Sequence, residues 1–402
     1  MVKASKSTIK YINKQNVLNA FIGKDELTKA EISEQTKLSF ATISNLISHL
    51  VDEGWILENR IGESNGGRKP IVYSLNGDLY YIITFRITPK GMMVGIVNLK
   101  SEIVYSKTII MPVYDEKSLT KLISAAFEDI YASRKDISDR FCAVAVSCPG
   151  IIDNTEGRLL YSSILHLSDI NMTELIRRAS GSNINVHLFH DTDALLLGEY
   201  YLNSDLNGKS LAYILCENGV GFAFFDDGRL FRQKGMGMEL GHITMNLSLG
   251  SDSNYYSKGG YLGKTLSESP AIRRFFELCD ETNSPIDSSL DPTSMDYADI
   301  VNLCFHNNPV ARQVIKEQIS LLGWVVSNVV DLFNPDVVII GGVLTMLGKE
   351  LEDSLTASVK ERAIGVFTED LKICNAKYGF NSSLIGMAKH VMTQQIFKSI
   401  KL

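Results

Sequence analysis

The chain has 402 residues, of which 45% are hydrophobic and 21% are charged, with a formal net charge of −6. This composition excludes a disordered or fibrous chain and a histone-like binder that is basic over its whole surface, and the length allows two or three packed units. Because no run approaches the roughly 20 apolar residues of a membrane span, and the Lys-containing N-terminus has no signal-peptide core, we expect a cytoplasmic protein with no membrane contact.

Three helices are predicted at the start of the chain. A first helix is expected where residues 17–22 show apolar side chains at helical spacing. The tetrapeptide Thr28-Lys29-Ala30-Glu31 has the form of a capping box and opens a second helix that ends near Thr36. Ser39 is a suitable N-cap for a third helix that ends at Gly54. The third helix carries one apolar stripe, made of Ile43, Leu46, Ile47 and Leu50.

The opposite face of the third helix carries short polar side chains and no acid before Asp52. Two helices joined by a tight turn are typical of the helix-turn-helix, whose last helix lies in the major groove of DNA. Asn45 could pair with adenine, and Thr42 could contact a thymine methyl group or a phosphate. The alternative is a solvated polar face on an ordinary three-helix bundle. The candidate DNA contacts of this segment are Lys37, Ser39, Thr42, Ser44, Asn45 and Ser48.

Two strands, residues 55–60 and 71–75, follow the third helix and are joined by a glycine-rich turn, as in the wing of a winged helix. Gly67, Arg68 and Lys69 at the end of this turn are further candidate DNA contacts, because a basic pair can bind phosphates or enter a narrow minor groove. A solvated basic turn is the alternative. Five lysines and no acid among the first 24 residues fit a DNA-binding unit over residues 1–78.

From residue 79 onward, strands and helices alternate. Three apolar runs, 80–87, 92–97 and 103–111, predict a meander of strands. A helix near 118–132 leads to a buried strand, 141–148, which ends at the turn Pro149-Gly150. Later parts repeat this strand and helix pattern, with strands at 212–215 and 221–225 and a helix at 311–332 that enters a strand at 337–342. The order predicts two α/β lobes around a cleft.

Together the two units resemble the ROK (repressor, open reading frame, kinase) family, which includes sugar repressors and sugar kinases. The matching landmarks are the winged helix over residues 16–70, Ser147-Cys148-Pro149-Gly150, His190-Asp191-Thr192-Asp193, Glu239-Leu240-Gly241-His242, and Asn334-Pro335-Asp336 leading to Gly341-Gly342. The resemblance implies an α/β protein with an N-terminal winged helix-turn-helix, residues 1–78, followed by a two-lobed, actin-like, ROK sugar-kinase-like domain, residues 79–402.

The resemblance also implies a sugar site. In ROK kinases the residue that matches Asp191 is the base that takes a proton from a sugar hydroxyl, and those that match Glu239 and His242 bind sugar hydroxyls. Pro149, Gly150 and His190 would shape the pocket, with His190 standing where the family usually has Asn. Without the resemblance, surface carboxylates would be the ordinary interpretation of Asp191 and Glu239.

The departures from the kinase pattern argue against phosphoryl transfer. Arg86 aligns with the Asp of the first phosphate loop, whose glycines are replaced, and Glu217 opens the second phosphate turn, where it would face the triphosphate. Asn254, Tyr256 and Tyr261 occupy the positions of three zinc-binding cysteines, so no metal and no cofactor are expected. Gly263 stands where a further sugar-binding Glu is found, which puts one sugar contact in doubt.

The sequence therefore predicts a DNA-binding transcriptional repressor of carbohydrate-utilisation genes that is not an enzyme. Its expected partners are operator double-stranded DNA, a sugar inducer such as xylose or glucose, and a second copy of the chain in a homodimer or larger homo-oligomer. Sugar in the cleft would release the DNA. One alternative is a sugar kinase with an added DNA-binding unit. Another is a regulator without a small ligand, controlled by a protein that binds its lobes.

Overall fold

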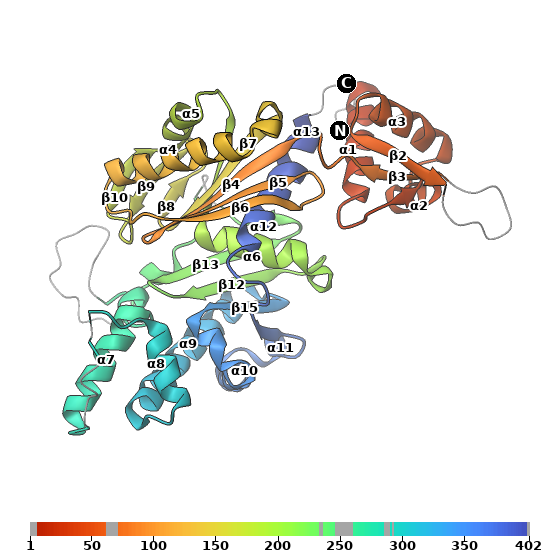
Figure 1. Cartoon of the computed structure of the whole chain (residues 1–402). Coiled ribbons are helices and arrows are strands. Elements are labelled where there is room, and N and C mark those ends of the chain that lie inside the picture. Colours follow the sequence, from red (N-terminus) through yellow and green to blue (C-terminus); the bar gives the residue numbers. More distant parts are fainter. Residues whose placement is uncertain are drawn as a thin grey trace.

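The structure is a computed structural model that describes residues 6–61, 71–232, 236–245, 260–284, 290–291 and 293–399. A small N-terminal unit lies beside one end of a larger unit with two lobes, and both ends of the chain lie near the small unit (Figure 1). No helix in the described ranges combines the length and the apolar character needed to span a bilayer.

The small unit is a three-helix bundle with a three-stranded sheet in the order β1-β3-β2. Its elements are α1 (Lys6–Ala20), β1 (Leu27–Thr28), α2 (Lys29–Thr36), α3 (Phe40–Asp52), β2 (Ile56–Ile61) and β3 (Ile71–Leu75). Thr28 and Glu31 form the expected capping box, and Ser39 is the N-cap of α3. The first helix begins about three turns earlier than its apolar residues suggest, and the sequence analysis missed β1, a strand of only two residues.

A hydrophobic core unites the three helices of the small unit. The stripe of α3 is buried as predicted, and Val17 and Leu18 of α1 pack with it. Lys14 is also buried, and its charge is paired there, since its Nζ lies 2.6 Å from a carboxylate oxygen of Glu53 at the end of α3. Lys14 therefore ties α1 to α3 and is not part of a basic surface, contrary to the expectation drawn from the N-terminal lysines.

The first lobe contains a five-stranded sheet in the order β11-β7-β4-β5-β6. The meander predicted from residues 80–111 is present as β4 (Tyr81–Thr88), β5 (Gly91–Asn98) and β6 (Ile103–Ile110). The other elements are α4 (Glu116–Ser133), η1 (Lys135–Arg140), β7 (Phe141–Cys148), α5 (Met172–Ser180), β11 (Asn185–His190) and the separate small sheet of β8 (Ile151–Asp153), β9 (Arg158–Ser162) and β10 (Leu167–Asn171).

The second lobe contains a five-stranded sheet in the order β14-β13-β12-β15-β16. Its strands are β12 (Leu211–Cys216), β13 (Val220–Asp226), β14 (Arg229–Leu230), β15 (Val337–Gly342) and β16 (Lys372–Asn375). Its helices are η2 (Ser204–Leu206), η3 (Leu240–His242), η4 (Leu262–Lys264), α7 (Glu268–Glu281), α8 (Tyr297–Phe305), α9 (Pro309–Phe333), η5 (Val343–Leu347), α10 (Lys349–Arg362) and α11 (Gly365–Thr368).

Two helices form a middle layer between the two sheets (Figure 1). They are α6 (Asp191–Leu202) and α12 (Ser382–Val391). Their backbones approach closely, since a Cβ on Gly386 would lie 2.3 Å from the backbone nitrogen of Gly198. The outer face of the first sheet packs on α4 and α5, and that of the second packs on α7 to α10.

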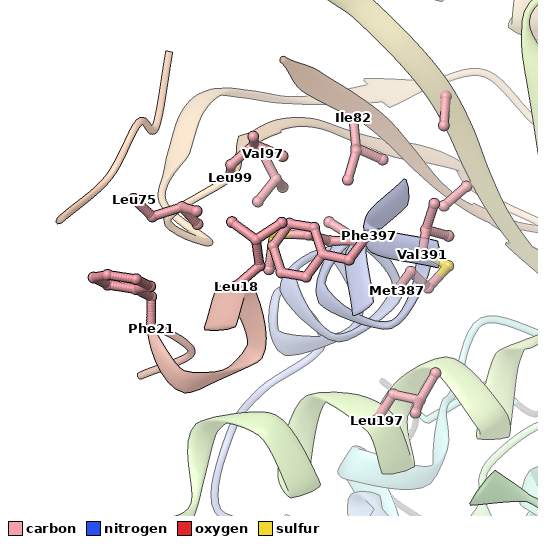
Figure 2. Close-up of a cluster of buried hydrophobic side chains, with 14 of the residues drawn as sticks. Leu18, Phe21, Leu75, Ile82, Val97, Leu99, Leu197, Met387, Val391 and Phe397 are labelled. Carbon is pink, nitrogen blue, oxygen red and sulfur yellow. The ribbon is translucent and has the colours of Figure 1, made fainter. Parts of the chain in front are cut away.

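One hydrophobic cluster continues from this middle layer into the small unit (Figure 2). After α12 the chain makes a π-helical turn, Met392–Ile396, and then the short helix α13 (Phe397–Ser399). Phe397 is fully buried, and its ring centroid lies 6.1 Å from that of Trp55 in an edge-to-face arrangement. Leu18 and Leu75 of the small unit belong to the same cluster as Phe397 and Val391 (Figure 2).

Candidate functional sites

The polar face of α3 is open to solvent. Asn45 and Ser48 are exposed, and Thr42 and Ser44 are half-buried. The buried stripe fixes the helix from behind, so these side chains point away from the bundle core. Such side chains can reach base edges when the helix enters a major groove.

Two of the other candidates shape the turn before α3. Lys37 ends α2 in the left-handed conformation, with φ of 56°. The Ser39 hydroxyl accepts a hydrogen bond from the Thr42 amide at 3.3 Å, and the two hydroxyl oxygens lie 2.9 Å apart. Sequence reasoning overlooked Phe40, which is 59% exposed in the first turn of α3, because its spacing from Ile43 resembles a continuation of the buried stripe. Gly67, Arg68 and Lys69 lie outside the described residues.

The candidate sugar residues begin at the carboxyl ends of two neighbouring parallel strands. Because β11 pairs with β7 so that His190 lies beside Cys148, the turn at Pro149 and Gly150 is adjacent to the start of α6. Gly150 has φ of +122°, and a Cβ there would lie 2.4 Å from the carbonyl oxygen of Tyr161. This turn therefore requires glycine, and ligands of α/β sheets tend to bind at such strand ends.

The first residues of α6 are held by local hydrogen bonds. His190 is the N-cap, and the Asp191 Oδ1 accepts a hydrogen bond from the Thr192 amide at 2.8 Å. The Nδ1 of His190 lies 3.2 Å from the Asp191 Oδ1, and the two side chains are only 13% and 16% exposed. The helix N-terminus also stabilises the negative charge of Asp191.

A separate turn of the second lobe brings Glu239 and His242 to the same region. The turn packs on the start of β13, where a Cβ on Gly241 would lie 2.5 Å from the carbonyl oxygen of Val220. Gly221 of the same strand is covered by Thr192 of α6. The His242 ring packs edge-to-face on Tyr261, with 5.1 Å between ring centroids.

The charges of this region act on His190. Burial opposes protonation of His190, but the carboxylates of Asp191, Glu239 and Asp193 outweigh it and raise the pKa of His190. One region therefore contains Pro149, Gly150, His190, Asp191 and Glu239. His242 lies on the same turn as Glu239, and its amide donates to the Glu239 carbonyl oxygen. Closely placed donors and acceptors of this kind suit a polyol.

The sequence analysis missed an ion pair beside these residues. An Arg232 guanidinium nitrogen lies 2.6 Å from the Asp193 Oδ2, and the two side chains are 18% and 5% exposed. Arg232 is also one of the charges that act on His190. In the sequence, the second Asp of His190-Asp191-Thr192-Asp193 indicates one member of this ion pair. Nothing around Arg232 indicates that it is the other member.

Arg86 and Glu217, at the two positions that the resemblance aligns with kinase phosphate loops, are a base and an acid. Arg86 of β4 is buried and stacks on Phe380, with 4.3 Å between its Cζ and the ring centroid. Burial raises the pKa of Glu217, between β12 and β13, to about 7, although the positive charge of Arg86 acts in the opposite direction. An acid and a buried Arg thus occupy the positions of those loops.

Among the residues that the structure describes, no group of three or more His, Cys, Asp or Glu side chains could hold a metal ion. Tyr261, at one of the positions of the zinc-binding cysteines, lies against His242. Asn254 and Tyr256, at two others, lie outside the described ranges.

Comparison with known proteins places these features in one family. The xylose repressor of Caldicellulosiruptor bescii is 25% identical over 404 aligned residues, which cover 96% of this chain and 97% of that protein. The crystal structure of a ROK family transcriptional regulator, a homologue of the Escherichia coli MLC protein, superposes with a TM-score of 0.81 at 21% identity over 97% of both chains.

A ROK glucokinase from Streptomyces griseus, in complex with glucose and AMPPNP, has a TM-score of 0.62 at 18% identity. It covers 77% of this chain and 98% of its own, so the shared fold leaves about a quarter of this chain unmatched. The family model described as "ROK family" matches residues 86–394. The chain therefore belongs to the ROK family.

Proposed function

We propose that this protein is a DNA-binding transcriptional repressor that releases its operator when a sugar binds between its lobes. Residues 1–78 would bind DNA, and residues 79–402 would bind the sugar and hold two copies together. The single observation that carries the proposal is one hydrophobic cluster that joins the helix-turn-helix unit to the helices between the two sheets. It gives the candidate sugar site a direct physical connection to the candidate DNA-reading face.

The DNA unit would read an operator with Asn45 and Ser48 in the major groove, while Arg68 and Lys69 contact phosphates or the minor groove. One such unit has a small contact area, and linking two of them raises the effective concentration of the second. We therefore propose a homodimer or larger homo-oligomer that spans successive half-sites.

The sugar would be held by the carboxylates of Asp191 and Glu239 and by the imidazoles of His190 and His242. Carboxylate oxygens accept hydrogen bonds from sugar hydroxyls, and imidazoles can donate or accept them. The name of the Caldicellulosiruptor relative supports an aldose such as xylose, and glucose is the next candidate.

The coupling would run along α6 and α12. Asp191 is the first residue of α6, and α6 packs against α12 through Gly198 and Gly386. Beyond α12, a π-helical turn leads to Phe397 against Trp55. Closure of the lobes on sugar would shift these contacts and change the spacing of the paired DNA units. Such a coupling is typically worth about 1–3 kcal/mol and requires different sugar affinities in the two states.

We further propose that the protein is not an enzyme and works in the cytoplasm without a metal or cofactor. Arg86 and Glu217 support this proposal. Arg86 stands in place of the Asp of the first phosphate loop, whose glycines are replaced, and Glu217 puts a carboxylate where the triphosphate would lie.

The test is fluorescence anisotropy with labelled DNA from upstream of this protein's own gene, at near-physiological salt and with unlabelled nonspecific DNA as competitor. Xylose, glucose and other aldoses are added in turn, and Asp191→Asn is the matched variant. We expect specific binding that one sugar reverses in the wild type but not in Asp191→Asn.

Other results would decide for the alternatives. No preference over competitor DNA, together with ATP turnover on a sugar, would replace the proposal with the kinase alternative. Specific DNA binding with no response and no thermal shift across the sugar panel would leave a repressor controlled by another protein.

A further inference from the structure

A cavity of about 390 Å³ lies beside the edge strand β11 of the first lobe. Its walls come from the turn between β8 and β9, from α5, from β11, and from α12 with the π-helical turn that follows it. Arg232 reaches it from the second lobe. The cavity is therefore a half-open pocket lined by segments that are distant in the sequence and that meet beside α12.

The wall carries two arginines, Arg177 and Arg232, and two histidines, His187 and His390. Glu156, which is exposed, is the acidic side chain among the lining residues. Burial, together with the charges of Arg232, His187 and Lys398, lowers the pKa of His390 to about 3. Burial also lowers the pKa of His187, and a neutral imidazole can still donate one hydrogen bond to an anion.

Both arginines have donor groups to spare. Arg177 uses its Nε to donate to the carbonyl oxygen of Ile184 at 3.2 Å, and no described residue forms an ion pair with it. Arg232 uses one terminal nitrogen for Asp193, and its buried Nε has no hydrogen-bond partner among the described residues. The donors that a ligand in the cavity would use are the terminal nitrogens of Arg177 and the second terminal nitrogen of Arg232.

The aromatic ring of Phe189 organises the inner end of the cavity. The Arg232 Cζ lies 5.4 Å from its centroid, and the His390 ring packs on it edge-to-face at 5.9 Å. The His390 Nδ1 lies 3.4 Å from the Tyr201 hydroxyl oxygen. Arg232 and His390 are thus held in place before any ligand arrives, which reduces the entropy cost of binding.

We propose that this cavity is a second ligand site, separate from the candidate sugar residues, for a small molecule bearing a phosphate or carboxylate group. The candidate sugar residues Asp191, Glu239 and His242 are not among its lining residues. Arg177 of α5 and Arg232, which follows β14, both line the cavity and would donate to the oxyanion. Planar guanidinium groups bind phosphate and carboxylate with two parallel hydrogen bonds, and the cavity volume is within the range of small-molecule sites.

The first experiment uses the full chain with ¹³C-labelled histidine and follows the seven histidine signals by NMR. Potassium phosphate and potassium acetate are titrated separately against potassium chloride of equal ionic strength. We expect saturable shifts of the His187 and His390 signals. The exposed histidines His49 and His306 are internal controls and stay unchanged. Shifts confined to His49 would place the anion on the DNA face and overturn the proposal, as would no shift with either anion.

The two probes separate the possible ligands. Binding of phosphate alone assigns a phosphorylated compound, and binding of acetate at similar concentrations assigns a carboxylic acid. Neither readout requires DNA or a sugar, so the outcome is independent of the repressor proposal.

The matched variants are Arg177→Gln and Arg178→Gln on the same helix. Arg178 is 78% exposed and pairs with Glu174, so it reports nonspecific charge effects. Calorimetry is expected to show about tenfold or greater loss of anion affinity in Arg177→Gln and no loss in Arg178→Gln. Arg177→Lys, which keeps the charge but loses the planar group, serves if Arg177→Gln fails to fold, and is expected to bind more weakly than wild type but more tightly than the Arg177→Gln level of about tenfold loss. Equal losses in Arg177→Gln and Arg178→Gln would overturn the proposal.

Discussion

On α3 the candidate base contacts come from one continuous helix, whereas the candidate sugar contacts come from three segments that meet at the ends of strands. These polar side chains of α3 are neutral and either exposed or half-buried. The charged side chains of the sugar site are half-buried, and the carboxylates act on His190. Exposed polar groups contribute little to folding stability, whereas buried charges change stability greatly when one partner is removed. We therefore expect substitutions of buried charges beside the sugar site to change the free energy of unfolding, and substitutions on α3 to change DNA affinity with little effect on stability.

The largest effect is expected at the buried ion pair beside the sugar site. Asp193→Ala leaves the Arg232 guanidinium buried without its partner, so the free energy of unfolding should fall by about 3–5 kcal/mol. Urea denaturation of the full chain measures this change. Asp205→Ala, at an exposed acid in the turn after α6, is the control and should change stability by less than about 0.5 kcal/mol. Equal stability of the two variants would contradict the importance of the pair.

The next effect concerns ligand affinity. Asp191→Asn keeps the size of the side chain but removes the charged acceptor, so sugar binding should weaken by about 1.5–3 kcal/mol, roughly 10–100-fold. Calorimetry with the inducing sugar measures the change. DNA affinity without sugar should stay at the wild-type value, because Asp191 is not one of the candidate DNA contacts and Asn keeps the size of the side chain. A variant that lost both activities would show that the two regions are not separable in this way.

On the DNA face we expect a smaller and purely local change. Asn45→Ala removes one potential pairing with adenine, which should cost about 1–3 kcal/mol of operator affinity and relax base preference at one position. The free energy of unfolding should remain unchanged, since Asn45 is exposed. Anisotropy with single-base operator variants measures both quantities. Uniform weakening on all sequences would instead indicate a phosphate contact.

The smallest effect is a pH dependence at the second phosphate turn. Because the pKa of Glu217 is raised to about 7, the folded protein holds this proton more tightly than the unfolded chain does. Its contribution is favourable at low pH and is lost as pH rises from about 4.5 to 7. Glu217→Gln should therefore raise the free energy of unfolding by about 1–2 kcal/mol at pH 8, with little change at pH 4.5. The exposed Glu361→Gln should show no such difference.

The same contrast explains what could be predicted from sequence. The caps at Thr28 and Ser39, the stripe of α3 and the meander of the first lobe all depend on residues close together in the chain. Their patterns repeat with the period of the helix or strand, so elementary stereochemistry is sufficient to locate them. The start of α1 was missed because its early turns carry no apolar stripe.

Contacts between distant segments could not be predicted in this way. Arg232 meets Asp193, and Phe397 meets Trp55, only after both lobes have formed, and no local pattern connects either pair. The candidate sugar residues were found through family resemblance, and their placement on three segments required the register of β7 with β11. Such pairings depend on how distant segments come together in the fold, so the spacing of residues along the sequence does not reveal them.

The position of α12 has a consequence for protein synthesis. The ribosome makes the three-helix bundle long before α12 and Phe397, yet these later residues fill the layer between both sheets and make the contact with Trp55. A nascent chain could present α3 to DNA before the helix that links it to the lobes exists. Truncated products that end before residue 382 would then carry a DNA-reading face with no link to the cleft.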